Sequence, residues 1–226
     1  MINTFKKALP HTLPVFAGYV FLGIAFGFLV ISKGFPAWYP VVMSVVIYSG
    51  ALEFAAIPLL SLPFEPVSAF IMGIMLSVRH LFYGLPMLKK YSDAGMMKFP
   101  LIYTLSDETF SIASSVKPPE DVNKNLFYLV ISVSDYLYWV LGTVIGSLFG
   151  NFIKLDTSGI DFVLTALFIV LFIEQIKTKE GKISGFSGLI CSFAVLLVFG
   201  AENMVLISMV VILIALLASR RVLSDD

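Results

Sequence analysis

Apolar runs of roughly 15 to 25 residues follow one another along almost the whole chain. An α-helix of about 20 residues crosses the ~30 Å of hydrocarbon in a bilayer, whereas the alternating pattern of membrane-barrel strands is absent from these runs. Of the 226 residues, 58% are apolar and 13% are charged, while a soluble domain carries about 25% charged residues. The sequence therefore predicts an all-α integral membrane protein, folded as one polytopic domain over residues 1–226.

The apolar pattern separates into eight helical segments. They cover residues 13–31, 40–60, 68–88, 101–115, 126–150, 161–176, 183–199 and 204–218. The second segment contains Gly50 and Pro58, and the fourth is short and polar. Because broken or re-entrant helices have such features, we expect about six to eight full crossings.

The basic residues favour a cytoplasmic N-terminus, because cytoplasmic loops carry an excess of lysine and arginine. With eight crossings, the loop charges divide nine inside to five outside. If the fourth segment and either the second or the third were re-entrant, Lys89, Lys90 and Lys98 would move inside. The division would then be twelve to two.

Two GxxxG spacings, Gly23 to Gly27 and Gly142 to Gly146, lie in different halves of the chain. Such spacings let helices approach closely. A turn and a glycine-containing segment follow each of them, so an internal duplication is one interpretation of the pattern. Duplicated halves are common in transporters, where the substrate site lies at their interface.

Ionisable residues inside the predicted segments are the main pointer to function. They are Glu53, Arg79, His80, Asp107, Glu108 and Asp135. An arginine in a membrane helix costs roughly 2.5–3.5 kcal/mol on insertion scales, so it faces protein, water or a counter-charge. We expect one shared polar cavity with Arg79 as its positive centre. Such a cavity suits a zwitterion, because a guanidinium holds a carboxylate and a carboxylate holds an ammonium group.

The candidate residues divide into two groups by expected role. Arg79, Gly50, Glu53 and Tyr83 are candidates for substrate binding, and His80, Asp107, Glu108 and Asp135 for charge pairing or coupling. Other interpretations remain open. Arg79 could extend to the membrane interface, His80 could be a packing residue, and the acidic pair at 107 and 108 could belong to a surface amphipathic helix.

Other classes of function have little support. The zero net charge gives no electrostatic basis for binding nucleic acid. The sequence contains no HExxH, GxSxG or P-loop motif, so we expect a protein that is not an enzyme and that holds no metal or cofactor. Its single cysteine, Cys191, lies in an apolar run and is expected to be a small core residue.

Several blocks together resemble the AzlC family, the large subunit of bacterial branched-chain amino acid exporters. The blocks are GYVFLGIAFG (18–27), YSGALEF (48–54), SVRHLFYG (77–84), SDETF (106–110), WVLGTVIG (139–146) and GIDFVLTALFI (159–169). They occur in the family's order and cover nearly the whole chain. The family often has Gln, Asn and Pro where this chain has Glu53, Ser77 and Thr165, and an ionisable residue at 53 could change the substrate or the coupling.

The resemblance implies a multi-pass transporter of the bacterial cytoplasmic membrane that exports branched-chain or related hydrophobic amino acids. It also implies a small membrane partner of the AzlD type, for which the GxxxG faces would be suitable surfaces. Two alternatives remain: a membrane scaffold or assembly subunit that does not transport, and an exporter of another small zwitterion. The buried carboxylates and His80 motivate a further hypothesis, coupling to the proton gradient.

Overall fold

The computed structural model describes residues 2–60, 65–150 and 179–200, with single positions between 169 and 176 and between 204 and 215. For a few residues inside helices, Arg79 among them, it describes the backbone only. The chain divides into two compact units, Met1–Asp161 and Phe162–Asp226. All regular elements in the described ranges are helices, which confirms the predicted all-α class. The prediction of a single membrane domain stays a prediction.

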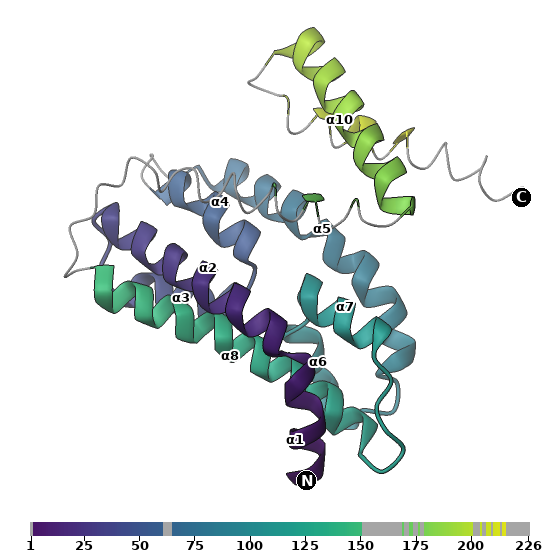
Figure 1. The fold of residues 1–226 in the computed structure, drawn as a ribbon. Helices are drawn as coiled ribbons and strands as arrows, with labels where there is room; N and C mark the ends of the chain where they lie inside the picture. Colours follow the sequence, from purple (N-terminus) through teal and green to yellow (C-terminus); the bar gives the residue numbers. More distant parts are fainter. Residues whose placement is uncertain are drawn as a thin grey trace, which may run out of the picture. The chain divides into compact units, whose positions relative to one another are not determined.

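Two long helices form the centre of the first unit. Helix α2 spans Leu13–Ser32 and helix α8 spans Lys124–Gly150, and the two lie side by side in Figure 1. Both are long and apolar enough to cross a membrane. The short helix α1 (Ile2–Ala8) and the 3₁₀ turn η1 (Leu9–His11) precede α2. Lys7 of α1 forms an ion pair of 2.6 Å with Asp121, in the loop before α8.

Glycines make the contact between α2 and α8 unusually close. A Cβ atom on Gly23 would lie 2.7 Å from the Trp139 carbonyl oxygen, and one on Gly142 would lie 2.5 Å from the Val20 carbonyl oxygen. Further along the same contact, Gly150 faces Ile31. Residue numbers increase together along both helices, so α2 and α8 pack in parallel. The prediction that the GxxxG faces suit a partner subunit is wrong for these faces, because they are buried against each other.

The predicted second segment, 40–60, consists of two helices and not one. Helix α3 spans Trp38–Val46 and helix α4 spans Gly50–Leu60, which confirms the expected break at Gly50. Tyr48 lies between them with φ of +44°, in the left-handed region that side chains other than glycine rarely adopt. Such a residue costs about 1–3 kcal/mol and persists only where surrounding contacts enforce it.

The predicted fourth segment is interrupted as well, and its treatment as one helix is wrong. Helix α5 spans Pro66–Lys90, and a short 3₁₀ turn η2 (Gly95–Met97) leads into helix α6 (Lys98–Tyr103). The helix is interrupted after Tyr103, and helix α7 (Asp107–Ser115) begins after three intervening residues. Ser106 supplies the physical reason, because its extended backbone interrupts the helical path after α6 and its side chain caps the start of α7.

The two interrupted helix pairs approach the centre of the α2–α8 pair from opposite ends (Figure 1). The ring of Tyr48 contacts that of Tyr136, halfway along α8, at 4.9 Å between centroids, whereas Phe54 contacts Phe26, further along α2, at 5.5 Å. Helix α4 therefore runs in the direction of α2 and returns to the end from which α3 starts. On the other side, Tyr103 at the end of α6 contacts Tyr136 in the middle of α8, with ring centroids 6.1 Å apart.

Helix α7 then returns toward the start of α8. Thr109 donates a hydrogen bond to Asp135, and the Tyr128 hydroxyl donates one to the Val116 carbonyl, just beyond the end of α7. The residue numbers run in opposite directions, so α7 is antiparallel to α8. The pairs α3–α4 and α6–α7 are thus two helical hairpins whose tips meet halfway along α2 and α8.

In the second unit, helix α10 spans Lys179–Phe199 and contains the predicted segment 183–199. Gly185 packs against Ile176 and Phe172, which belong to the same unit. The predicted segments 161–176 and 204–218 lie mostly outside the described residues.

Candidate functional site

The hairpin tips create a polar junction in the centre of the first unit. We define this junction by the two breaks, residues 47–49 and 104–106, and by the α2 and α8 side chains that contact them. Tyr103 joins the two tips directly, since its hydroxyl donates to the carbonyl oxygens of Val45 (2.5 Å) and Val46 (3.1 Å). The Tyr136 hydroxyl also donates to Val45 (3.1 Å). The last carbonyls of α3, which have no partner within their own helix, are satisfied in this way.

Glu53 lies on one side of the junction and is completely buried. The Trp139 indole Nε1 donates to both of its carboxylate oxygens, at 3.1 and 3.2 Å. The backbone N–H of Ser49 donates to Oε1 at 3.0 Å. Glu53 therefore holds the first turn of α4 as a capping residue does. A Cβ on Gly50 would lie 2.9 Å from the Trp139 ring, so only glycine fits without displacing the indole.

A chain of hydroxyl groups on the other side connects the buried carboxylate of Asp135 with the half-buried carboxylate of Glu108. Tyr19 Oη is hydrogen-bonded to the Glu108 carboxylate and lies 2.8 Å from Ser106 Oγ. Ser106 Oγ lies 3.0 Å from Thr109 Oγ1, which donates to Asp135 Oδ2 at 2.8 Å. The series Glu108–Tyr19–Ser106–Thr109–Asp135 thus links α7, α2 and α8. We call it the hydroxyl chain.

Asp135, at one end of the hydroxyl chain, is buried without full hydrogen bonding in the described part of the chain. It is 0% exposed, and its Oδ1 atom has no hydrogen-bond partner among the described residues. The ring of Tyr48 contacts that of the next residue, Tyr136, with centroids 4.9 Å apart. Burying an unpaired carboxylate is costly, so Asp135 is suited to hold a proton or to receive a cationic group.

The structure brings some of the predicted site residues together and not others. Gly50, Glu53, Glu108 and Asp135 all lie at the junction. Asp107, the first residue of α7, is half-buried beside it. The side chain of Arg79 lies outside the described residues, so its predicted pairing with a carboxylate stays a prediction.

His80 and Tyr83 lie on α5. Their rings contact each other with centroids 6.0 Å apart. Tyr83 also stacks on Phe110 of α7, at 4.7 Å between ring centroids. His80 Nδ1 lies 3.2 Å from the carbonyl oxygen of Ser77, one turn earlier in the same helix.

Sequence reasoning missed the hydroxyl groups of the site. Tyr19, Ser106, Thr109 and Tyr103 are neutral, so a search for ionisable residues passes over them. One signal was available: serine followed by two acidic residues is a typical helix start. It would have placed a break at Ser106 and a hydroxyl at the level of the buried carboxylates.

The junction combines helix ends of both polarities. Helices α4 and α7 begin there, and a helix N-terminus carries partial positive charge that favours an anion such as a carboxylate. The carboxylates of Asp135 and Glu108 favour an ammonium group or a proton. No group of three or more potential metal ligands occurs in the described part of the chain. The arrangement suits a small zwitterion, in the manner of transporters with interrupted helices.

Replacement of Ser106 by alanine is expected to destabilise the protein by about 1–2 kcal/mol, because Ser106 Oγ accepts the capping hydrogen bond from the Thr109 N–H (3.2 Å). Ser114→Ala on the same helix is the matched control, since that hydroxyl is exposed and bonds only to carbonyls of its own helix. Thermal unfolding of the purified proteins measures both. Equal melting temperatures for the two variants would contradict the capping role.

Comparison with known proteins identifies the family. The family model described as AzlC protein matches residues 14–153. The chain is 43% identical over 217 residues to the branched-chain amino acid transport protein AzlC of Bacillus subtilis, which covers 96% of this chain and 85% of the relative. It is 35% identical to an uncharacterized membrane protein of Helicobacter pylori strain J99, with 97% and 96% covered, and 27% identical to the inner membrane protein YgaZ of Escherichia coli, with 78% and 75% covered. No solved structure matches the chain. The chain belongs to the AzlC family of membrane proteins.

Proposed function

We propose that this protein is the large subunit of a secondary transporter that exports branched-chain or related hydrophobic amino acids, and that it is not an enzyme. The name of the Bacillus subtilis relative supports this substrate class. The observation that carries the proposal is the junction, where two helix N-termini meet the buried carboxylate of Asp135 and the half-buried carboxylate of Glu108. A free amino acid presents complementary groups, a carboxylate and an ammonium.

The proposed topology has two re-entrant hairpins. Helices α3, α4 and α7 have 9, 11 and 9 residues, so each is at most about 17 Å long and cannot cross ~30 Å of hydrocarbon. If α2, α5, α8 and the three later segments cross completely, the total is six, the lower end of the expected range. Lys89, Lys90 and Lys98 then lie with the N-terminus, and the basic loop residues divide twelve to two in favour of a cytoplasmic N-terminus.

The proposed site lies between α2–α3–α4 and α5–α6–α7. Each of these groups consists of one long helix followed by an interrupted hairpin, and the hairpins open toward opposite ends. Such an arrangement is typical of inverted repeats in transporters. It differs from the duplication suggested by the GxxxG spacings, which would pair α2 with α8.

The energy source in this proposal is the proton gradient. The hydroxyl chain connects Asp135 to Glu108 through three hydroxyl groups that can each donate and accept a hydrogen bond. It provides a route by which a proton could pass between two carboxylates without crossing apolar side chains. We include a small AzlD-type subunit in the proposal as the partner implied by the family.

Counterflow tests the function. Proteoliposomes preloaded with unlabelled leucine, with and without the small subunit, are given labelled leucine outside. Labelled leucine is expected to accumulate transiently, and unlabelled valine or isoleucine should compete while lysine and glutamate should not. A complete lack of counterflow with correctly inserted protein and partner would favour the scaffold alternative. Competition by a different solute class alone would reassign the substrate.

A further inference from the structure

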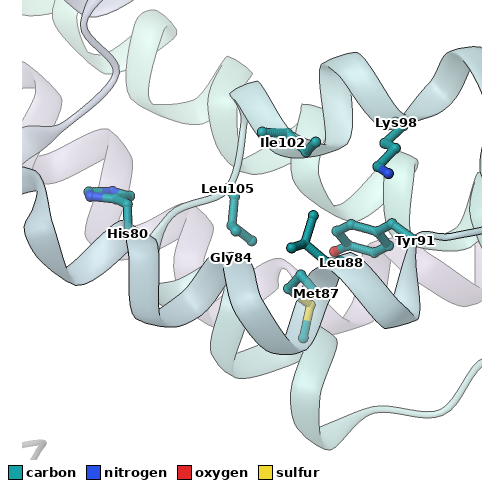
Figure 2. A pocket seen from close by; sticks show the side chains of 8 residues that line it. All are labelled: His80, Gly84, Met87, Leu88, Tyr91, Lys98, Ile102 and Leu105. Atoms are coloured by element: carbon teal, nitrogen blue, oxygen red, sulfur yellow. The ribbon is translucent and has the colours of Figure 1, made fainter.

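A pocket of about 140 Å³ lies between α5 and α6. Its lining is mainly apolar, and Figure 2 shows His80 at one end and Lys98 near the other. The lining residues are His80, Gly84, Met87, Leu88, Tyr91, Lys98, Ile102 and Leu105. An apolar protein cavity of about 150 Å³ holds a benzene-sized molecule. The pocket therefore has the volume and the lining for a branched aliphatic side chain.

The charge at the pocket adds a second feature. Lys98 is half-buried, and its ammonium group makes no hydrogen bond or ion pair with another described residue. A cation beside an apolar pocket is complementary to a molecule that carries a carboxylate next to an aliphatic group. A lipid tail is aliphatic too. However, the charged headgroup of a lipid is a full acyl chain away from the end of its tail in the bilayer interior, whereas an amino acid carries its carboxylate next to its side chain.

The position of the pocket connects it to the junction. Leu105 lines the pocket and belongs to the break between α6 and α7. The next residue, Ser106, is a member of the hydroxyl chain. A molecule in the pocket is thus separated from the junction by the thickness of one backbone segment.

We propose that the pocket formed by His80, Gly84, Lys98 and Leu105 is an access site that binds branched-chain amino acids before they reach the junction. The identity of the ligand rests on the proposed function. Lys98 attracts the carboxylate, and the apolar lining around Gly84 receives the side chain. Movement of the α6–α7 break then passes the molecule to the hydroxyl chain.

Gly84 offers a direct way to fill the pocket. A Cβ on Gly84 meets no atom within 4 Å, and the same is true of Gly73 on the same helix, which does not line the pocket. Gly84→Leu is therefore expected to raise the KM for leucine at least tenfold in counterflow, while Gly73→Leu leaves it unchanged. Lys98→Met is expected to raise KM as well, with Lys89→Met as its control.

A binding measurement keeps the result independent of transport. In a Cys191→Ser background, Gly84→Cys is labelled with a maleimide in the presence and absence of leucine. Leucine is expected to slow the labelling of Gly84→Cys at least threefold and to leave that of Gly73→Cys unchanged. If wild-type protein shows no counterflow but leucine still protects position 84, the proposed function fails and the site stands. If counterflow is normal while Gly84→Leu keeps its KM and leucine gives no protection, the pocket is not an access site and the inference is wrong.

Discussion

Replacing Gly146 with alanine is expected to lower the melting temperature of the purified protein by about 6–12 °C. A Cβ at Gly146 would overlap the Ile24 carbonyl group of α2. The overlapping atoms are backbone atoms of two long helices, so no side chain can move aside to make room. Overpacking of this kind costs up to about 3 kcal/mol, and one kcal/mol corresponds to about 2–4 °C for a protein of this size.

Gly18→Ala is the matched control, because a Cβ at Gly18 on the same helix pair meets no atom within 4 Å. Its melting temperature should stay within about 2 °C of the wild type, or rise slightly because alanine favours helix. Fluorescence-detected gel filtration after heating measures both variants in detergent. A Gly146→Ala protein as stable as Gly18→Ala would mean that the parallel contact of α2 and α8 is wrong.

Replacing Asp135 with asparagine is expected to lower transport driven by a pH gradient at least 100-fold and to lower leucine counterflow only about threefold, because the Glu108 carboxylate remains at the junction to hold the substrate ammonium group. Asparagine keeps the shape of Asp135 and can still accept the hydrogen bond from Thr109. It cannot bind and release a proton. Counterflow exchanges leucine for leucine with no net movement of protons, so it does not require that step.

Three accompanying variants distinguish a loss of proton coupling from a folding defect, and distinguish Asp135 from Glu53 as the coupling residue. Thr109→Val breaks the hydroxyl chain but keeps the Asp135 carboxylate, so pH-driven transport should fall about 5- to 20-fold through loss of one relay hydroxyl. Thr143→Val, with its hydroxyl bonded only to a carbonyl of its own helix, should have little effect. Glu53→Gln tests the other buried carboxylate, whose oxygens are both occupied by the Trp139 indole. Loss of pH-driven transport in Glu53→Gln with full activity in Asp135→Asn would move the coupling role to Glu53.

The buried face of α8 was predictable from the sequence alone. Tyr128, Ser132, Asp135, Trp139 and Gly142 recur at helical spacing, and all five are buried in the structure. The period of 3.6 residues places them on one side of a helix whatever surrounds it. The break before Gly50 was predictable for a similarly local reason.

The break at Ser106 was not predicted, because an apolar pattern extends across it from Leu101. Local capping by Ser106 prevailed over that pattern. The grouping of Tyr19 with Glu108 was also beyond sequence reasoning, because 89 residues separate the two. Periodicity describes one helix at a time and contains no distance between two helices.

The sequence by itself therefore determined that the surrounding solvent is lipid and that the elements are helices, but not the break within the fourth segment. Its apolar content requires a membrane protein made of helices, since backbone groups in lipid must be hydrogen-bonded within the segment. Only the tertiary structure decided that Gly23, Gly27, Gly142 and Gly146 bring α2 and α8 into close parallel contact. It also decided that both hairpin tips meet beside this contact. Close approach of the backbones sets the positions of Tyr19 and Asp135, and the breaks in the hairpins bring Ser106 and Thr109 between them. The chemistry of the site depends on those distances, which arise from packing between segments far apart in the chain.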